Sequence, residues 1–308
     1  MLEVNISGLN LKSPIILASG ILGVSHSTMK RIIDAGAGAI TTKSIGPKPR
    51  KGYKNPSIVE IYPGTFINSV GLGNPGIDDF IAEIIEMKKY NCPIIVSVFG
   101  DTNDSYLRVA TKAINAGADA IELNISCPHA EVSSIGIDSH LTFELVKLLK
   151  KSIKKPLLIK LNPNVTNIEE IAVAAEKGGA DGVVAINTLS AMIIDINTKR
   201  PILSHGSGGL SGKAIHPIAV KKVYDLYKVL KIPIIGCGGI FDWKDIIEFF
   251  LAGASAVQIG TALYKDIELF KSINEGLSRY LKKNGFSSIS ELVGLAHDFQ
   301  TQEVPDFD

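Results

Sequence analysis

The 308-residue sequence predicts an α/β protein, a (β/α)8 TIM barrel with long βα loops over its carboxyl-terminal mouth. Eight short apolar runs rich in β-branched residues recur along the chain, and each precedes a longer segment with helical spacing. Four junctions between a helix and the next strand repeat a similar phrase, as in DAGAGAI and NAGADAI. An open, doubly wound sheet would show a similar rhythm, so the number of strands and the placement of the site favour the closed barrel.

The expected strands are nearly continuous apolar runs. A parallel sheet that is covered on both faces requires such runs, because neither face meets water. The repeated phrases mark helix ends, since glycine just past a helix accepts the left-handed conformation. In chain order the strands are expected at residues 14–18, 39–42, 93–98, 120–123, 156–161, 182–186, 233–235 and 256–259.

Three connections are longer than the others, at residues 44–75, 126–139 and 189–213. Loops of this length in a barrel commonly form the walls of a site. Residues 264–295 are expected to form a helix and a short second helix before a polar tail. Because no linker interrupts the pattern, residues 1–308 are expected to form a single domain.

The composition indicates a soluble, cytoplasmic protein with 45% hydrophobic and 20% charged residues. A formal net charge of +1 gives no basic field that would attract nucleic acid or anionic lipid. No apolar run is long enough to span a bilayer. The three cysteines lie far apart without a CxxC pair, so neither a disulfide framework nor a metal site is expected.

Barrel enzymes place their chemistry at the carboxyl ends of the strands. Two turns there are rich in glycine, CGGI at 237–240 and IGTA at 259–262, and GGLSG at 208–212 could supply a further wall. Backbone N–H groups of such turns, near helix N-termini, suit a phosphate monoester. The glycines could instead serve only tight turns, and alone they indicate no more than a phosphorylated ligand or cofactor.

Two lysines, Lys43 and Lys160, end apolar strands, so their ammonium groups should point into the barrel mouth. A buried ammonium group is costly without an anionic partner, and a flavin ring that becomes anionic on reduction would be one. The alternative is a lysine whose flexible chain carries the charge out to solvent.

Amide side chains also gather near strand ends and in the long loops. They can pair with a planar ring of alternating C=O and N–H groups, such as a pyrimidine. Each asparagine taken singly could equally form a turn. The amide-bearing residues are Asn68, Asn124 and Asn187, the last followed by the hydroxyl of Thr188.

Cys127 lies in NISCPH (124–129), directly before a proline that keeps it on a loop. Its thiolate could act as a general base or nucleophile, although an ordinary thiol is mostly protonated at neutral pH. Position alone leaves open whether Cys127 is a bystander. Cys92 and Cys237 are expected to be small buried hydrophobes or turn residues.

Six sequence motifs spread along nearly the whole chain together resemble those of the class 1 dihydroorotate dehydrogenases. They are most similar to the motifs of the class 1B catalytic (FMN) subunit. The resemblance implies oxidation of dihydroorotate to orotate in pyrimidine synthesis, with one FMN per chain. It also implies a partner subunit that carries FAD and a [2Fe-2S] cluster and passes electrons to NAD, around a homodimer core in a heterotetramer. The motifs are TTKS (41–44), NSVGLGNPG (68–76), ELNISCPH (122–129), NTLS (187–190), GGLSG (208–212) and GCGGI (236–240).

The same resemblance implies roles for individual residues. Cys127 would be the base that removes the C5 proton while the C6 hydride moves to flavin N5. The residues implied in holding orotate are Lys43, Asn68, Ser69, Val70, Gly71, Leu72, Asn124, Asn187 and Thr188. The residues implied in holding FMN are Ser19, Lys43, Ser44, Ser97, Asn124, Lys160, Ile186, Gly212, Gly238, Gly239, Gly260 and Thr261.

Two positions depart from the family pattern. Ser97 stands where many members have an asparagine, and His129 replaces the asparagine of the commoner NISCPN. Both substitutions also occur in the FMN domain of dihydropyrimidine dehydrogenase, so a dihydrouracil-type activity is the nearest alternative. Further alternatives are a class 1A homodimer that reduces fumarate, and a barrel without redox chemistry, such as a phosphosugar isomerase or a noncatalytic flavin-binding subunit.

Overall fold

The computed structural model describes residues 1–125 and 135–298, and its centre is a closed barrel of eight parallel strands in the order β10-β15-β16-β3-β4-β7-β8-β9. The TIM barrel predicted from the sequence is therefore confirmed. Each expected apolar run overlaps one barrel strand, with ends that differ from the prediction by no more than two residues. The strands are β3 (Ile15–Leu17), β4 (Ala39–Thr41), β7 (Ile94–Val98), β8 (Ala120–Asn124), β9 (Leu157–Lys160), β10 (Gly182–Ala185), β15 (Ile234–Cys237) and β16 (Ala256–Ile259).

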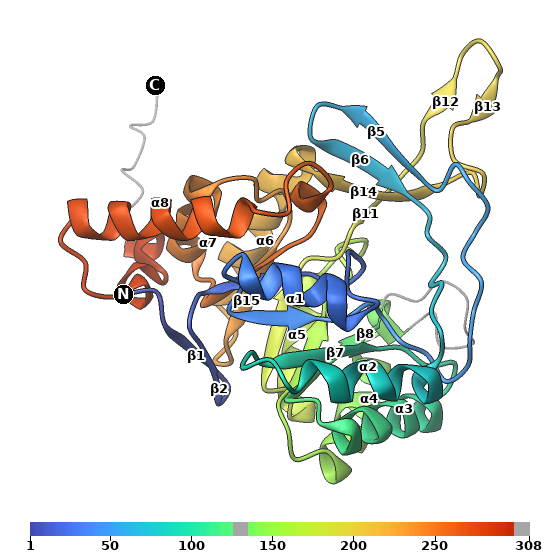
Figure 1. Cartoon of the computed structure of the whole chain (residues 1–308), viewed down its shortest axis with the longest axis horizontal. Helices are drawn as coiled ribbons and strands as arrows, with labels where there is room; N and C mark the ends of the chain where they lie inside the picture. The colour runs from blue at the N-terminus through green and yellow to red at the C-terminus, as the bar shows by residue number, and fades with distance from the viewer. Residues whose placement is uncertain (126–134, 299–308) are drawn as a thin grey trace, which may run out of the picture.

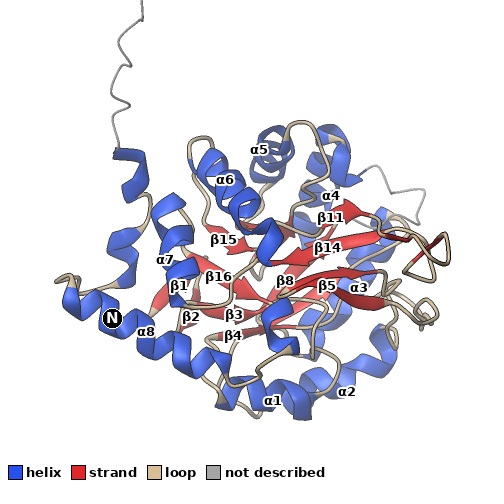
Figure 2. Cartoon of the chain, turned by 90° about the horizontal axis from the view of Figure 1, so that it is seen from above, coloured by secondary structure: helices blue, strands red, loops and turns tan. Residues whose placement is uncertain are grey.

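Helices surround the barrel, and Figure 2 shows them as an outer layer around the red strands. Their apolar faces pack on the barrel, where residues such as Phe80, Leu145 and Phe250 are fully buried. The helices are α1 (His26–Asp34), α2 (Ile77–Met87), α3 (Asn103–Ala116), α4 (Ser139–Ser152), α5 (Ile168–Gly178), α6 (His216–Tyr227), α7 (Trp243–Ala252) and α8 (Leu269–Lys283). Short 3-10 helices are η1 (Ile135–Ile137), η2 (Lys213–Ile215), η3 (Thr261–Tyr264), η4 (Ile289–Leu292) and η5 (Leu295–Asp298).

The helix ends follow the signals in the sequence. Gly117, Gly179 and Gly253 adopt left-handed C-cap conformations after α3, α5 and α7, at three of the four repeated phrases. Beyond residue 264 the chain forms η3, then α8 and two 3-10 turns, which agrees with the expected long helix and shorter second element.

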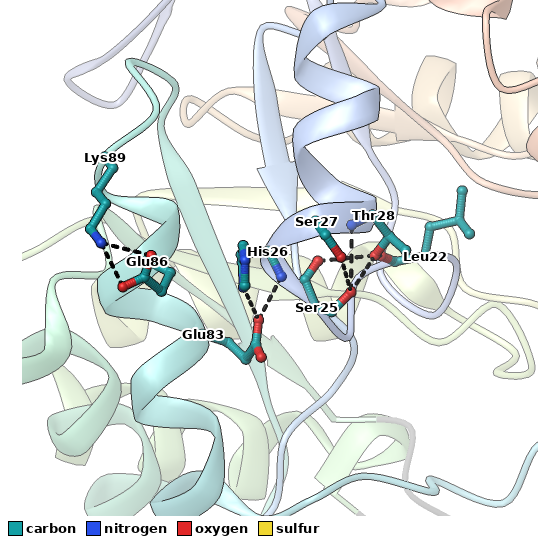
Figure 3. A network of polar contacts seen from close by, with 8 residues as sticks. All are labelled: Leu22, Ser25, His26, Ser27, Thr28, Glu83, Glu86 and Lys89. Carbon is teal, nitrogen blue, oxygen red and sulfur yellow. Dashed lines mark hydrogen bonds and ion pairs between the residues drawn. The ribbon is translucent and has the colours of Figure 1, made fainter.

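The start of α1 is joined to the side of α2 by polar contacts (Figure 3). The backbone N–H of His26 and its ring Nδ1 both donate to Glu83 Oε2, at 2.6 Å and 2.9 Å. The Ser25 side chain caps α1 by accepting from the backbone N–H of Thr28. Glu83 therefore anchors the first turn of α1 to the side of α2.

Two long connections build a second sheet that the sequence analysis left as loops. It is antiparallel, with the order β11-β14-β6-β5, and is called the roof sheet below. Figure 1 shows it at one end of the barrel, with the small hairpin of β12 (Ile194–Asp195) and β13 (Arg200–Pro201) projecting beyond it. The roof strands are β5 (Ile58–Tyr62), β6 (Thr65–Asn68), β11 (Leu189–Ala191) and β14 (Gly208–Gly212).

The opposite end of the barrel is covered by an N-terminal hairpin of β1 (Val4–Ile6) and β2 (Leu9–Leu11). Its inward side chains are buried, and the Ser7 hydroxyl donates to the carbonyl of Asp181, directly before β10. The roof sheet and the N-terminal hairpin therefore lie at opposite ends of the barrel. In residues 1–125 and 135–298, no helix combines the length and apolar character needed to cross a membrane.

Candidate functional site

A cavity of about 580 Å³ lies between the carboxyl ends of the barrel strands and the roof sheet. This volume is within the range of small-molecule and cofactor sites. The cavity brings together nearly all the site residues predicted from the sequence. Those in its lining are Ser19, Lys43, Ser44, Asn68, Ser69, Val70, Gly71, Leu72, Asn124, Lys160, Ile186, Asn187, Thr188, Gly212, Gly238, Gly239, Gly260 and Thr261.

Two predicted residues are not among them. Cys127 lies outside the described residues, as does His129. Ser97 is fully buried on β7 and does not line the cavity. Its hydroxyl oxygen lies 2.9 Å from Ser44 Oγ. The short side chain of Ser97 ends at this contact and does not extend into the cavity.

Ser44 links Ser97 to the cavity. Its hydroxyl oxygen also accepts a hydrogen bond of 3.0 Å from Asn124 Nδ2 and lies 3.3 Å from Ser19 Oγ. Side chains at the ends of β3, β4, β7 and β8 are thus tied together around one hydroxyl group. Ser97 fixes Ser44 and does not itself form the wall.

The predicted phosphate site consists of backbone groups on unusual glycine conformations. Gly238 and Gly239 follow β15 with φ of 144° and 69°, and Gly212 ends β14 with φ of 91°. Within residues 1–125 and 135–298, the backbone N–H groups of Gly238 and Gly239 donate to no protein oxygen. Free N–H groups in a turn just ahead of a helix are what a phosphate group needs.

Both predicted lysines reach the cavity. Lys160 is buried at the end of β9, and its Nζ donates to Gln258 Oε1 at 2.7 Å. Lys43 is half-buried at the end of β4, and burial lowers the pKa of its ammonium group from the usual 10.5. In the described part of the chain no carboxylate pairs with Lys43. An anionic ligand would therefore favour the protonated form of its amino group.

Two buried polar atoms of the cavity lining lack hydrogen-bond partners among the described residues. They are Ser69 Oγ, just after β6, and Glu122 Oε1, on β8. Such atoms are rare in folded proteins and require a partner. A ligand that carries both donors and acceptors, such as FMN or a pyrimidine ring, fits a cavity with these two atoms.

The segment after β6 has a strained turn at the cavity. Gly71 and Leu72 both have left-handed backbones, with φ of 75° and 54°. An added Cβ at Gly71 would lie 2.7 Å from the ring of Tyr53, so only glycine fits there. A left-handed backbone is uncommon at a bulky residue other than glycine. The turn presents the backbone of residues 69–72 to the cavity.

The sequence analysis missed several lining residues. Tyr53 and His205 come from different long connections, and their rings stack with centroids 3.8 Å apart. Nothing in the sequence marks this pair. Glu122 and Gln258 did carry a signal, because each is a polar residue inside an otherwise apolar strand. The structure places both inside the barrel, beneath the cavity mouth.

Comparisons with known proteins agree with this geometry. Residues 1–281 match the family model described as dihydroorotate dehydrogenase. The chain is 51% identical over 299 residues to the dihydroorotate dehydrogenase B (NAD(+)) catalytic subunit of Pyrococcus horikoshii, covering 96% of this chain and 98% of that protein. It is 47% identical over 305 residues to the corresponding subunit of Methanocaldococcus jannaschii, covering 97% and 99%.

A solved structure shares the fold. The crystal structure of the Eimeria tenella dihydroorotate dehydrogenase in complex with ferulenol superposes with a TM-score of 0.84. The aligned region covers 96% of this chain and 88% of the Eimeria tenella chain, at 23% sequence identity. At this identity the likeness establishes the barrel architecture alone.

Proposed function

Because the chain belongs to the dihydroorotate dehydrogenase family, we propose that it is the catalytic subunit that oxidises (S)-dihydroorotate to orotate in pyrimidine synthesis. The resemblance to class 1B enzymes noted in the sequence is confirmed by relatives named as B (NAD(+)) catalytic subunits. The observation that supports the activity best is the composition of the cavity beneath the roof sheet. It joins glycine turns suited to a phosphate with amide groups suited to a pyrimidine ring.

One FMN per chain would occupy the deeper part of the cavity. FMN supplies the hydride acceptor of the reaction when it is bound. The backbone of Gly238, Gly239, Gly260 and Thr261 would hold its phosphate. Ser19, Ser44, Asn124, Ile186 and Gly212 would line the remaining cofactor surface, with Lys160 as the cation beside the ring.

The substrate ring would lie against the roof sheet. Asn68, Asn124, Asn187 and Thr188 offer the donors and acceptors that its amide groups require. Its carboxylate would pair with Lys43 and the backbone N–H groups of residues 69–72, since charge-assisted hydrogen bonds are the stronger kind. Dihydrouracil lacks this carboxylate and would leave Lys43 unpaired.

Cys127 is proposed as the base that takes the C5 proton. It follows β8 by three residues, and Asn124 at the end of that strand lines the cavity. The proposal rests on this place in the sequence, because barrel enzymes carry their chemistry just after the carboxyl ends of the strands.

The electrons would leave through a partner. The relatives named as catalytic subunits use NAD(+), and the name implies a further subunit. We propose that this subunit carries FAD and a [2Fe-2S] cluster, and that two copies of the present chain form the core of a heterotetramer. Residues 1–308 would act as one FMN-binding domain, and the cytoplasmic location expected from the sequence stays a prediction.

The function is tested by mixing the purified protein anaerobically with dihydroorotate and following flavin absorbance near 450 nm. We expect bleaching that neither NAD nor fumarate reverses until the partner subunit is added. Reversal by fumarate alone would identify a class 1A enzyme. Bleaching by dihydrouracil but not by dihydroorotate would transfer the function to the dihydropyrimidine class, and a protein without flavin absorbance would contradict both.

The lowered pKa of Lys43 makes a prediction for orotate binding. The orotate carboxylate pairs with the protonated ammonium group, and burial lowers the pH at which that proton is lost. We expect the Kd of orotate to be constant below this pKa and to rise about tenfold per pH unit above it. Titration of the flavin spectrum with orotate between about pH 6 and 10 measures the effect.

The matched variant for this titration is Lys43→Met. It keeps much of the aliphatic chain but has no titrating group, so it should bind orotate more weakly and with a Kd that does not follow this pH profile. If the parent protein and Lys43→Met bind orotate with the same Kd at every pH, Lys43 is not the partner of the carboxylate.

A further inference from the structure

A chain of hydrogen-bonded side chains crosses the inside of the barrel below the cavity. Lys160 Nζ on β9 donates to Gln258 Oε1 on β16 at 2.7 Å. The other end of the same amide, Gln258 Nε2, donates to Glu122 Oε2 on β8 at 2.6 Å and to Thr41 Oγ1 on β4 at 3.2 Å. Residues from four strands therefore meet around one amide group.

The amide of Gln258 has a fixed orientation. Lys160 can only donate, so it must face the amide oxygen, and the amide nitrogen must then face the carboxylate. Glu122, Gln258 and Lys160 are 0%, 1% and 6% exposed. The structure thus places a buried carboxyl group and a buried amino group at the two ends of a neutral amide.

This arrangement has no evident value for stability. Burying a carboxylate is costly, and a separated ion pair recovers only part of that cost. Glu122 Oε1 also has no partner within residues 1–125 and 135–298, although it lies in the cavity lining. A buried carboxyl group that lines a ligand site with one oxygen unpaired indicates a role in function, because such atoms require a partner.

We propose that Glu122 is a positioning residue that orients Lys160 through Gln258 and whose charge lowers the reduction potential of the bound FMN. The inference rests on the proposed function, because it requires FMN in the cavity. Reduction adds negative charge to the ring, which the Lys160 cation favours and the Glu122 carboxylate opposes. The two side chains therefore act on the potential in opposite directions.

A lowered potential suits the electron acceptor of the relatives. Their names specify NAD(+), which is a weak oxidant, so a flavin held at too high a potential would retain the electrons. Lys160 alone would favour the reduced cofactor. Glu122 offsets this effect while leaving the ammonium group in place at the ring.

The test is a Glu122→Gln variant, which removes the charge and preserves the shape and the hydrogen bond from Gln258. We expect its equilibrium constant for flavin reduction to rise about tenfold, which is about +30 mV for a two-electron couple. The potential is read from anaerobic reduction against a reference dye, without dihydroorotate. Glu122→Asp retains the charge and should stay closer to the parent than Glu122→Gln does.

Two further variants complete the design. Glu83→Gln neutralises a carboxylate that pairs with His26 outside the cavity and should leave the potential unchanged (Figure 3). Glu122→Ala, which removes the charge and leaves space for water, should shift the potential in the same direction as Glu122→Gln. It provides the measurement if the glutamine variant does not fold.

The outcomes separate the two levels of the proposal. A parent protein that binds no FMN would overturn the proposed function itself. A parent that binds FMN, with Glu122→Gln at the same potential, would overturn only the role of Glu122. Equal shifts in Glu122→Gln and Glu122→Asp would also overturn it, because they would show that packing and not charge is responsible.

Discussion

Replacing Cys127 with alanine should slow the reduction of bound FMN by dihydroorotate by roughly 10²- to 10⁴-fold, the usual contribution of a general base. Without the thiolate no side chain at that position takes the C5 proton, so the hydride transfer coupled to its removal is impeded. FMN should remain bound, because the proposed phosphate contacts come from Gly238 and Gly239. Anaerobic stopped-flow absorbance near 450 nm measures the rate directly.

The matched control is Cys92→Ala. Cys92 is buried at the opposite end of the barrel, where its Sγ lies 3.7 Å from the carbonyl of Gly38. Burial raises the pKa of its thiol to about 12, so it carries no thiolate at neutral pH. Its loss should leave the rate of flavin reduction unchanged. A Cys127→Ala rate within twofold of the parent would remove Cys127 from the role of base.

Replacing Gly239 with alanine should weaken FMN binding by about two orders of magnitude. Gly239 has φ of 69°, and an L side chain in that region is disfavoured by about 1–2 kcal/mol. The added Cβ would also lie 2.6 Å from His216 Cβ and 2.8 Å from the carbonyl oxygen of Gly212. The turn must therefore move, and the N–H groups that face the phosphate move with it.

Flavin content after purification and fluorescence titration of the apoprotein with FMN measure this loss. Gly285→Ala is the control, because Gly285 has a similar φ of 77° but an added Cβ there would meet nothing within 4 Å. It carries the same backbone strain without the clash and should bind FMN normally. A Gly239→Ala protein with full flavin content would show that this turn does not hold the phosphate.

The barrel could be predicted from the sequence because its signals are local. Each strand is one apolar run, as in IIVSV at 94–98, and three of the helices, α3, α5 and α7, end at a glycine C-cap. The roof sheet could not be predicted in this way. Its strand β14 is mostly glycine and serine, and it lies in a sheet only because it pairs with β11 and with β6, the latter about 140 residues earlier.

Part of the site was predictable, because barrel enzymes place their site residues at the carboxyl ends of the strands. That rule located Lys43, Asn124 and Lys160, which the structure brings into one cavity. The rule does not predict how far a side chain reaches into the cavity. Ser97 was expected to contact the flavin, but in the structure its hydroxyl contacts Ser44 and does not line the cavity. The rule also overlooked Glu122 and Gln258, which lie within strands and reach the cavity from below.

The pairing of β6 with β14 limits how this barrel can be re-engineered. Enzymes of this architecture are usually treated as modular, since a loop at the mouth can be exchanged while the barrel is kept. Here the segment after β4 and the segment after β10 share a continuous ladder from Thr65–Gly212 to Asn68–Gly209. Grafting residues 44–75 alone would leave β14 without its native partner strand β6. The two segments must therefore be transferred together.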